Sequence, residues 1–91
     1  MILENVIIKM IDLVEDNMKV TVIGIGFVGL VNAIGFAAKG HEVFALDPDK
    51  KKIAALRRNE TTFKEYKLEE ELVKYSDRIR FTSEFRDAVY K

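Results

Sequence analysis

Residues 19–29 have the sequence KVTVIGIGFVG, an apolar run that leads directly into three closely spaced glycines. The run at residues 19–23 is short and nearly continuous, as in a parallel strand that is covered on both faces of its sheet. Gly24, Gly26 and Gly29 match the pattern G-x-G-x-x-G. Glycines are common, so the pattern alone is weak evidence. The position of the pattern between a predicted strand and a predicted helix makes the evidence stronger.

The residues that follow predict the rest of a dinucleotide-binding unit. Residues 27–39 are rich in small and apolar side chains and predict a helix, with Gly40 as its left-handed cap. A second apolar run at residues 41–46 predicts another strand. Asp47 ends this strand, at the position where such folds carry an acidic residue. Strand, glycine loop, helix, strand and acid together predict a dinucleotide site.

Each part of the motif has a chemical reason. Gly24 permits a tight turn out of the strand, and Gly26 lacks a Cβ, so the backbone can approach a pyrophosphate closely. Gly29 lets the helix lie close to the strand. The unpaired N–H groups near Phe27 and Val28, together with the positive end of the helix dipole, favour a bound phosphate. The alternative is that the glycines only make a tight turn.

Asp47 is the predicted acceptor for the hydroxyl groups of the adenosine ribose. Its charge repels a 2′-phosphate, so the expected cofactor is NAD and not NADP. The alternative role is that Asp47 is the N-cap of the next helix, with Pro48 in its first turn. The only histidine, His41, falls between a helix and a strand and is expected to lie in a surface loop.

The remainder of the chain continues the alternation of helices and strands. The pattern predicts a helix to about Arg58 that Asn59 ends, a loop at 60–67, a helix at 68–75, a strand at 78–81 and a last helix from Ser83 through Tyr90. Such alternation predicts an α/β fold with a partial Rossmann-like, doubly wound parallel sheet of about three strands.

Residues 1–17 are predicted to be an N-terminal extension, and residues 18–91 a truncated Rossmann domain. In residues 2–16 apolar side chains such as Leu3 and Met10 recur at helical spacing, which favours an amphipathic helix. The β-branched run at residues 6–8 leaves a strand open. In a complete fold another strand lies beside the first one. Here that first strand is expected at an exposed sheet edge, with residues 2–14 covering it or making a dimer contact.

Composition narrows the possible functions. The chain has 91 residues, and its 15 basic and 15 acidic side chains cancel, so we expect neither nucleic-acid nor membrane binding. It has no cysteine, which excludes disulfides and zinc–thiolate sites within the chain and fits a reducing cytoplasm. No signal peptide is evident, and the expected location is cytoplasmic. We assign no metal ligands.

Residues 18–30, MKVTVIGIGFVGL, resemble the opening of the UDP-glucose/GDP-mannose 6-dehydrogenases. The resemblance extends to about residue 90 through Gly40-His41-Glu42-Val43, Asp47, the LEEEL segment at residues 68–72 and Arg80-Phe81-Thr82. It implies a pyrophosphate site at Gly24, Gly26, Phe27, Val28 and Gly29, and an adenosine ribose site at Asp47 and Lys52. Without the resemblance, Lys50–Lys52 would be read as a solvated surface turn.

Two departures from the family limit what the resemblance implies. The family usually has Glu-Pro-Gly-Leu before the short helix, whereas this chain has Glu65-Tyr66-Lys67-Leu68. Family members are also longer, and they oxidise a sugar alcohol to the acid in two NAD-linked steps by means of a cysteine nucleophile. We therefore assign no catalytic residue to this chain and expect it to be inactive alone, with a homodimer or a separate catalytic chain as its possible partner.

Two other functions compete with this reading. One is a non-catalytic NAD-sensing module like the ligand-gating domains of potassium uptake systems. Those domains usually carry a charged residue where Phe27 stands, which weighs against them here. The other is a structural remnant that binds nothing.

Overall fold

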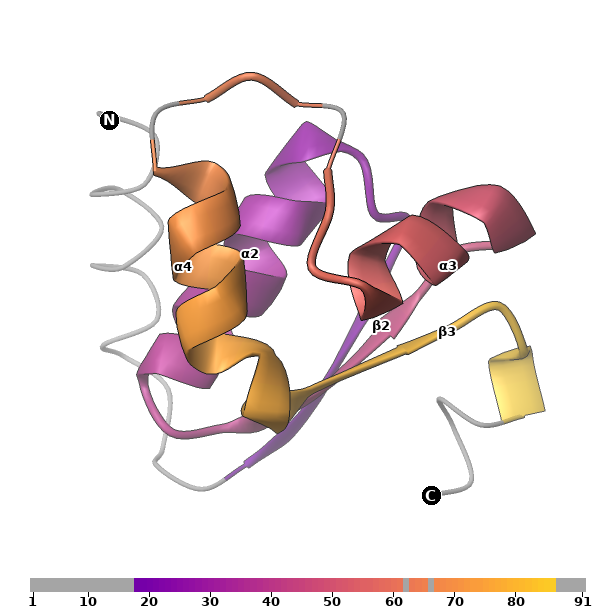
Figure 1. The fold of residues 1–91 in the computed structure, drawn as a ribbon. Helices are drawn as coiled ribbons and strands as arrows, with labels where there is room; N and C mark the ends of the chain where they lie inside the picture. Colours follow the sequence, from indigo (N-terminus) through magenta and orange to yellow (C-terminus); the bar gives the residue numbers. More distant parts are fainter. Residues whose placement is uncertain (1–17, 62, 66, 87–91) are drawn as a thin grey trace.

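A parallel three-stranded sheet forms the centre of the fold. The computed structural model describes residues 18–61, 63–65 and 67–86. The strands lie in the order β1-β2-β3 and comprise Lys19–Ile23 (β1), Glu42–Leu46 (β2) and Ile79–Thr82 (β3). The helices are Phe27–Ala38 (α2), Lys50–Arg57 (α3) and Leu68–Tyr75 (α4), followed by the 3₁₀ turn η1, Ser76–Arg78. The predicted α/β class and parallel sheet of about three strands are confirmed for these residues (Figure 1).

Two predicted segments fall wholly or partly outside the described residues. These are the N-terminal extension at residues 1–17 and the end of the helix expected from Ser83 through Tyr90.

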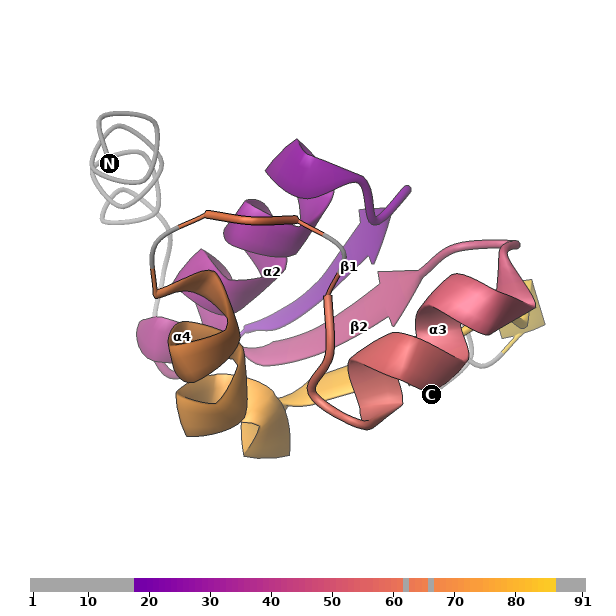
Figure 2. The ribbon, with the colours of Figure 1, turned by 45° about the horizontal axis from the view of Figure 1, so that its top comes forward.

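The three helices lie on the same side of the sheet (Figure 2). Helix α2 packs on β1 and β2, α3 contacts β3, and α4 packs against α2. Alternate residues of β2 and β3 face the helices and belong to the core. Val43 pairs with Ile79, and Ala45 pairs with Phe81. The resulting core consists of Ile25, Leu30, Val31, Ala33, Ile34, Ala37, Val43, Ala45, Ile53, Leu56, Leu68, Leu72, Ile79 and Phe81.

The ends of α3 differ in part from the prediction. Asp49 is the N-cap, because its carboxylate accepts a hydrogen bond of 3.0 Å from the backbone N–H of Lys52. The alternative that Asp47 caps this helix is therefore wrong, and Pro48 lies before the cap instead of in the first turn. Asn59 follows the helix with a φ of 61°, so the prediction that this residue ends it is confirmed.

Strand β1 is less covered than its sequence predicts. Its side chains alternate between exposed and half-buried, and that of Ile23 is 67% exposed. The reason is its place at one edge of the described sheet, where β2 is its neighbour. The edge position expected for the first strand is confirmed. The strand with the most buried residues is β2, in the middle, where Val43, Phe44, Ala45 and Leu46 are all buried.

His41 is buried, and the expectation of a surface loop is wrong. It is 0% exposed, and its Nδ1 accepts a hydrogen bond of 3.1 Å from the backbone N–H of Met18. Its ring also meets that of Phe36 edge to face, with 5.9 Å between the ring centroids. The histidine therefore ties the start of β1 to the end of α2.

Gly29 sets the separation of α2 and β1. A Cβ at this position would overlap the carbonyl oxygen of Gly24 and approach its carbonyl carbon to 3.1 Å. The obstacle is backbone, which cannot move aside as a flexible side chain can. The absence of a side chain at Gly29 therefore allows α2 to begin directly beside the end of β1.

We expect Gly29→Ala to lower the free energy of unfolding by about 1–3 kcal/mol, the usual range for overpacking a close contact. In a domain of this size each 1 kcal/mol corresponds to a shift of roughly 4–8 °C in Tm, which thermal unfolding followed by circular dichroism resolves. Gly26→Ala is the matched control, because a Cβ there would meet no atom within 4 Å. Equal Tm values for the two variants would contradict this explanation.

Candidate functional site

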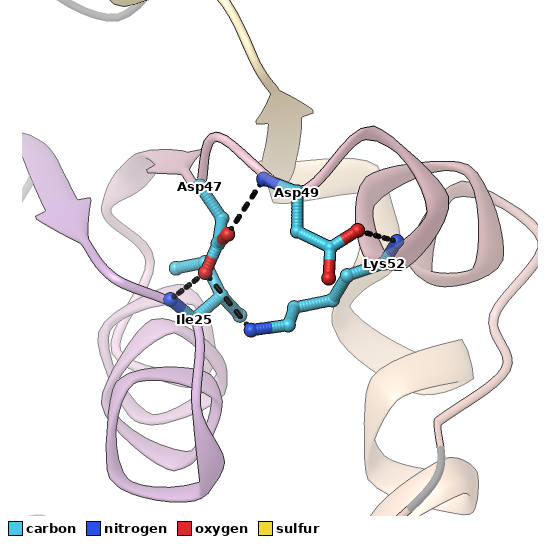
Figure 3. Close-up of polar contacts among 4 residues, drawn as sticks. All are labelled: Ile25, Asp47, Asp49 and Lys52. Atoms are coloured by element: carbon cyan, nitrogen blue, oxygen red, sulfur yellow. Dashed lines mark hydrogen bonds and ion pairs between the residues drawn. The ribbon is translucent and has the colours of Figure 1, made fainter.

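The predicted site residues gather at the carboxyl ends of β1 and β2. The backbone N–H of Gly24 donates a hydrogen bond of 2.8 Å to the carbonyl oxygen of Leu46, so the glycine loop begins beside the end of β2. Asp47 follows Leu46 directly and faces this loop (Figure 3). Parallel strands bring their carboxyl ends to one edge of the sheet, which is where open α/β folds bind ligands.

The glycine loop leaves the start of α2 open. Gly24 has a φ of +87°, a conformation that favours glycine, and it turns the chain out of β1. Gly26 is the N-cap of α2, and as a glycine it has no side chain to accept a hydrogen bond from the first turn. That turn also contains no acidic residue, and the space where a Gly26 Cβ would lie is empty to 4 Å. A free helix N-terminus with room in front of it suits an anion.

Asp47 accepts hydrogen bonds from three segments of the chain (Figure 3). Its Oδ2 accepts from the backbone N–H of Ile25 at 2.9 Å and from Lys52 Nζ at 3.1 Å. Its Oδ1 accepts from the backbone N–H of Asp49 at 2.9 Å. The residue is only 6% exposed. The carboxylate therefore joins the glycine loop, the end of β2 and the start of α3.

These donors favour the charged form of Asp47. Burial of the carboxyl group raises its pKa, but the N–H groups of Asp49 and Ile25 and the Lys52 ammonium outweigh burial. The pKa therefore lies below its ordinary value. A carboxylate has about four acceptor positions, and three are used here. The Lys52 side chain is 36% exposed, against 9% for Asp47, so solvent reaches the ammonium more readily than the carboxylate.

Phe27 and Val28 are placed differently at the start of α2. The Phe27 ring is half-buried and meets the Phe63 ring edge to face at a centroid distance of 5.6 Å. The Val28 side chain is 53% exposed, and its backbone lies in the first turn of α2. The structure thus brings all seven predicted residues to one end of the sheet: Gly24, Gly26, Phe27, Val28, Gly29, Asp47 and Lys52.

Three residues near the site were not predicted to belong to it. Asp49 could have been found, because an aspartate before a helix is a preferred N-cap. Ile25 takes part through its backbone N–H, for which its side chain gives no signal. Phe63 comes from a loop distant in sequence, and no local pattern marks it.

A small cavity adjoins the site. It has a volume of about 280 Å³ and is lined by residues of the glycine loop, of α3 and of the following loop, among them Ile25, Lys52, Leu56 and Phe63. A larger cavity of about 710 Å³ is lined by residues such as Gly40, Arg57 and Arg78, and none of the predicted site residues reaches it. The geometry of the motif therefore locates the site better than cavity size does.

The described part of the chain shows neither a metal centre nor a membrane span. Within residues 18–61, 63–65 and 67–86, no group of three or more histidine, aspartate or glutamate side chains is arranged to hold a metal ion. No helix in these ranges is long and apolar enough to cross a membrane.

The stability that Asp47 provides should depend on pH. Its pKa is lower in the folded state, so the carboxylate stabilises the fold above its unfolded pKa of about 4, and this contribution is lost as the pH falls through the folded value. We expect Asp47→Asn to cost about 1–3 kcal/mol at pH 7 and progressively less below pH 4. Urea unfolding of the wild-type chain and of Asp47→Asn, at pH 7 and at pH 3, measures this change in the cost of the substitution.

Asp49→Asn is the control for this experiment, because asparagine also caps helices well. A cost of Asp47→Asn that stays constant from pH 7 to pH 3 would contradict the assigned role of the carboxylate.

Comparison with known proteins agrees with this geometry. Residues 18–91 match the NAD binding domain of the UDP-glucose/GDP-mannose dehydrogenase family. The chain is 39% identical over 74 residues to the UDP-glucose 6-dehydrogenase of Rhizobium meliloti, which covers 79% of this chain and 17% of that protein. It is 42% identical over 81 residues to the corresponding protein of Rickettsia prowazekii, which covers 80% and 19% of the two chains.

Two solved structures are similar as well. A UDP-glucose dehydrogenase from Pyrobaculum islandicum superposes with a TM-score of 0.73 at 32% identity, over 82% of this chain and 18% of that one. A GDP-mannose dehydrogenase from Pseudomonas aeruginosa gives 0.70 at 31% identity, over 80% and 17%. The chain therefore spans less than a fifth of the length of these relatives.

The resemblance seen in the sequence is thereby confirmed, and so is NAD as the cofactor of the matched domain. The chain belongs to the UDP-glucose/GDP-mannose dehydrogenase family, and its residues 18–91 correspond to the NAD-binding domain of that family.

Proposed function

We propose that this chain binds NAD through the glycine loop, with the pyrophosphate at the start of α2 and the adenosine ribose at Asp47 and Lys52. The observation that carries the proposal is the open N-cap at Gly26. The first turn of α2 has neither a side-chain cap nor an acidic residue. No atom lies within 4 Å of a Gly26 Cβ position, and the Asp47 carboxylate approaches the same loop at Ile25.

The glycines and the first residues of α2 have different roles at the pyrophosphate. Gly24 turns the chain and Gly29 allows α2 to start close to β1. The backbone N–H groups of Phe27 and Val28 point along the axis of α2 and donate to phosphate oxygens. The helix dipole adds to this attraction without any basic side chain.

Asp47 and Lys52 act together at the ribose. The hydrogen bonds from Ile25 and Asp49 hold the Asp47 carboxylate in place. The ribose hydroxyls use its remaining acceptor position and share or displace the exposed Lys52 ammonium, which itself donates to ribose oxygens. The negative charge of the Asp47 carboxylate would repel the 2′-phosphate of NADP, so NADP binds more weakly than NAD.

Calorimetric titration with NAD tests the proposal. We expect saturable binding, and a ligand at a hundred times its Kd should stabilise the fold by about 2.7 kcal/mol, or roughly 10 °C or more in Tm. Gly26→Ala should fold normally, since its Cβ meets no protein atom. We expect it to bind NAD about tenfold or more weakly, because the Cβ enters the space assigned to the pyrophosphate.

The same titration with NADP supplies the control. NADP should bind at least about tenfold more weakly than NAD, and Asp47→Asn should narrow that gap at a temperature where the variant is folded. Wild-type protein that binds no dinucleotide would refute the proposal and favour a structural remnant.

We further propose that the bound NAD serves the oxidation of a nucleotide sugar, with catalytic groups that lie outside these 91 residues. The name of the family supports this reaction, and the sequence has no cysteine to act as the nucleophile. A separate catalytic chain would supply these groups, whereas a homodimer, the other proposed partner, would not, because a second copy also lacks cysteine. The cysteine-free sequence fits the reducing conditions of the cytoplasm.

Mixing experiments test the requirement for a partner. The chain alone should reduce no NAD in the presence of UDP-glucose or GDP-mannose. The portion of a family member that follows its NAD-binding domain, added as a separate polypeptide, should restore NADH formation detectable by absorbance. Gly26→Ala is the matched negative control. NAD binding without restored turnover would favour the alternative of an NAD-sensing module.

A further inference from the structure

The loop between α3 and α4 reaches back to the glycine loop. The backbone N–H of Thr61 donates a hydrogen bond of 3.1 Å to Glu69 of α4, and the N–H of Phe63 donates one of 3.1 Å to the Thr61 hydroxyl. These bonds attach Thr61 to α4 and Phe63 to Thr61. The Phe63 ring then meets Phe27 edge to face, at 5.6 Å between centroids and an interplanar angle of 69°.

Phe27 is the first residue of α2 and follows Gly26 directly. On the other side of Gly26, the Ile25 N–H is held by Asp47 at 2.9 Å. The two residues that flank Gly26 are thus each held by a side chain from a distant part of the sequence. Asp47 holds the backbone of one, and Phe63 holds the ring of the other.

The contact between Phe63 and Phe27 lies between a cavity and the core. Phe63 and Ile25 both line the cavity of about 280 Å³ beside the site. Within the described part of the chain, Phe63 is the aromatic partner of Phe27. Both rings are half-buried and pack against the main core.

We infer that Phe63 is a positioning residue for the pyrophosphate: through the Phe27 ring it fixes the first N–H groups of α2 in the orientation that a phosphate requires. The inference rests on the proposed NAD site and adds a residue to it. Phe63 itself touches no phosphate in this scheme. Its effect should therefore fall on ligands that contact the start of α2 and not on those that contact only Asp47 and Lys52.

The test compares three ligands of the full chain. NAD and ADP contain a pyrophosphate, whereas adenosine contains the same adenine and ribose without any phosphate. Phe63→Leu keeps an apolar side chain but loses the edge-to-face contact, and we expect it to weaken NAD and ADP roughly two- to tenfold, the contribution of an aromatic pair. Adenosine binding, followed by NMR chemical shifts, should stay unchanged. Phe63→Tyr should restore both pyrophosphate ligands, and Phe85→Leu, at a ring that is 58% exposed, is the matched control.

A double-mutant cycle tests the route through Phe27. In a Phe27→Leu background, Phe63→Leu should weaken ADP no further. Additive losses, or an equal loss for adenosine and ADP, would overturn the inference even if the wild-type chain binds NAD. Wild-type protein that binds neither NAD nor ADP would instead overturn the proposed function and, with it, the role of Phe63.

Discussion

The Asp47 carboxylate connects the start of α3 to the glycine loop, whose Ile25 lies 22 residues before Asp47. It accepts hydrogen bonds from the backbone N–H of Ile25 in the glycine loop, from the backbone N–H of Asp49 ahead of α3, and from the ammonium of Lys52. A buried charge without such partners would be costly, and here backbone donors on two sides satisfy it. The glycine loop has its shape because this carboxylate holds it against the end of β2. Fold and candidate site therefore depend on the same few hydrogen bonds.

Backbone proximity is the second constraint at this end of the sheet. The Gly29 backbone lies so close to the Gly24 carbonyl that a side chain would overlap it. Helix α2 therefore starts close in space to the end of β1, after the short glycine loop. This brings the first N–H groups of α2 to the edge of the sheet where Asp47 lies. Gly24 and Gly29 are thus required by the fold. Gly26, which faces open space, is left to be explained by a ligand.

The sequence predicted those features that depend on neighbouring residues. Apolar runs located the three strands to within a residue or two, and the spacing of Leu68 and Leu72 located α4 at its observed bounds. Gly40 and Asn59 end their helices with positive φ, as residues of these types often do. The seven predicted site residues also gather at one end of the sheet, because the motif itself encodes the turn from strand to helix.

The features that were missed depend on contacts between distant segments. His41 was placed in a surface loop because it falls between a helix and a strand, yet it is buried and contacts Met18 and Phe36. Whether Asp47 caps α3 depended on whether the glycine loop would bind its carboxylate, which spacing along the sequence cannot show. Phe63 reaches Phe27 only because α4 packs on α2 and carries the loop with it. Strand β1 is only partly covered because it lies at one edge of the described sheet. The order of strands in a sheet cannot be predicted from the residues of one strand.

The shared use of Asp47 has an evolutionary consequence. If Asp47 holds the ribose as proposed, a lineage that replaces this acid to change cofactor preference also loses its hydrogen bonds to the glycine loop and to the start of α3, and its first step is a less stable protein. Compensating donors or acceptors would have to arise elsewhere before the new preference could be selected. Substitution of this residue would then be limited by the stability of the fold as well as by cofactor binding.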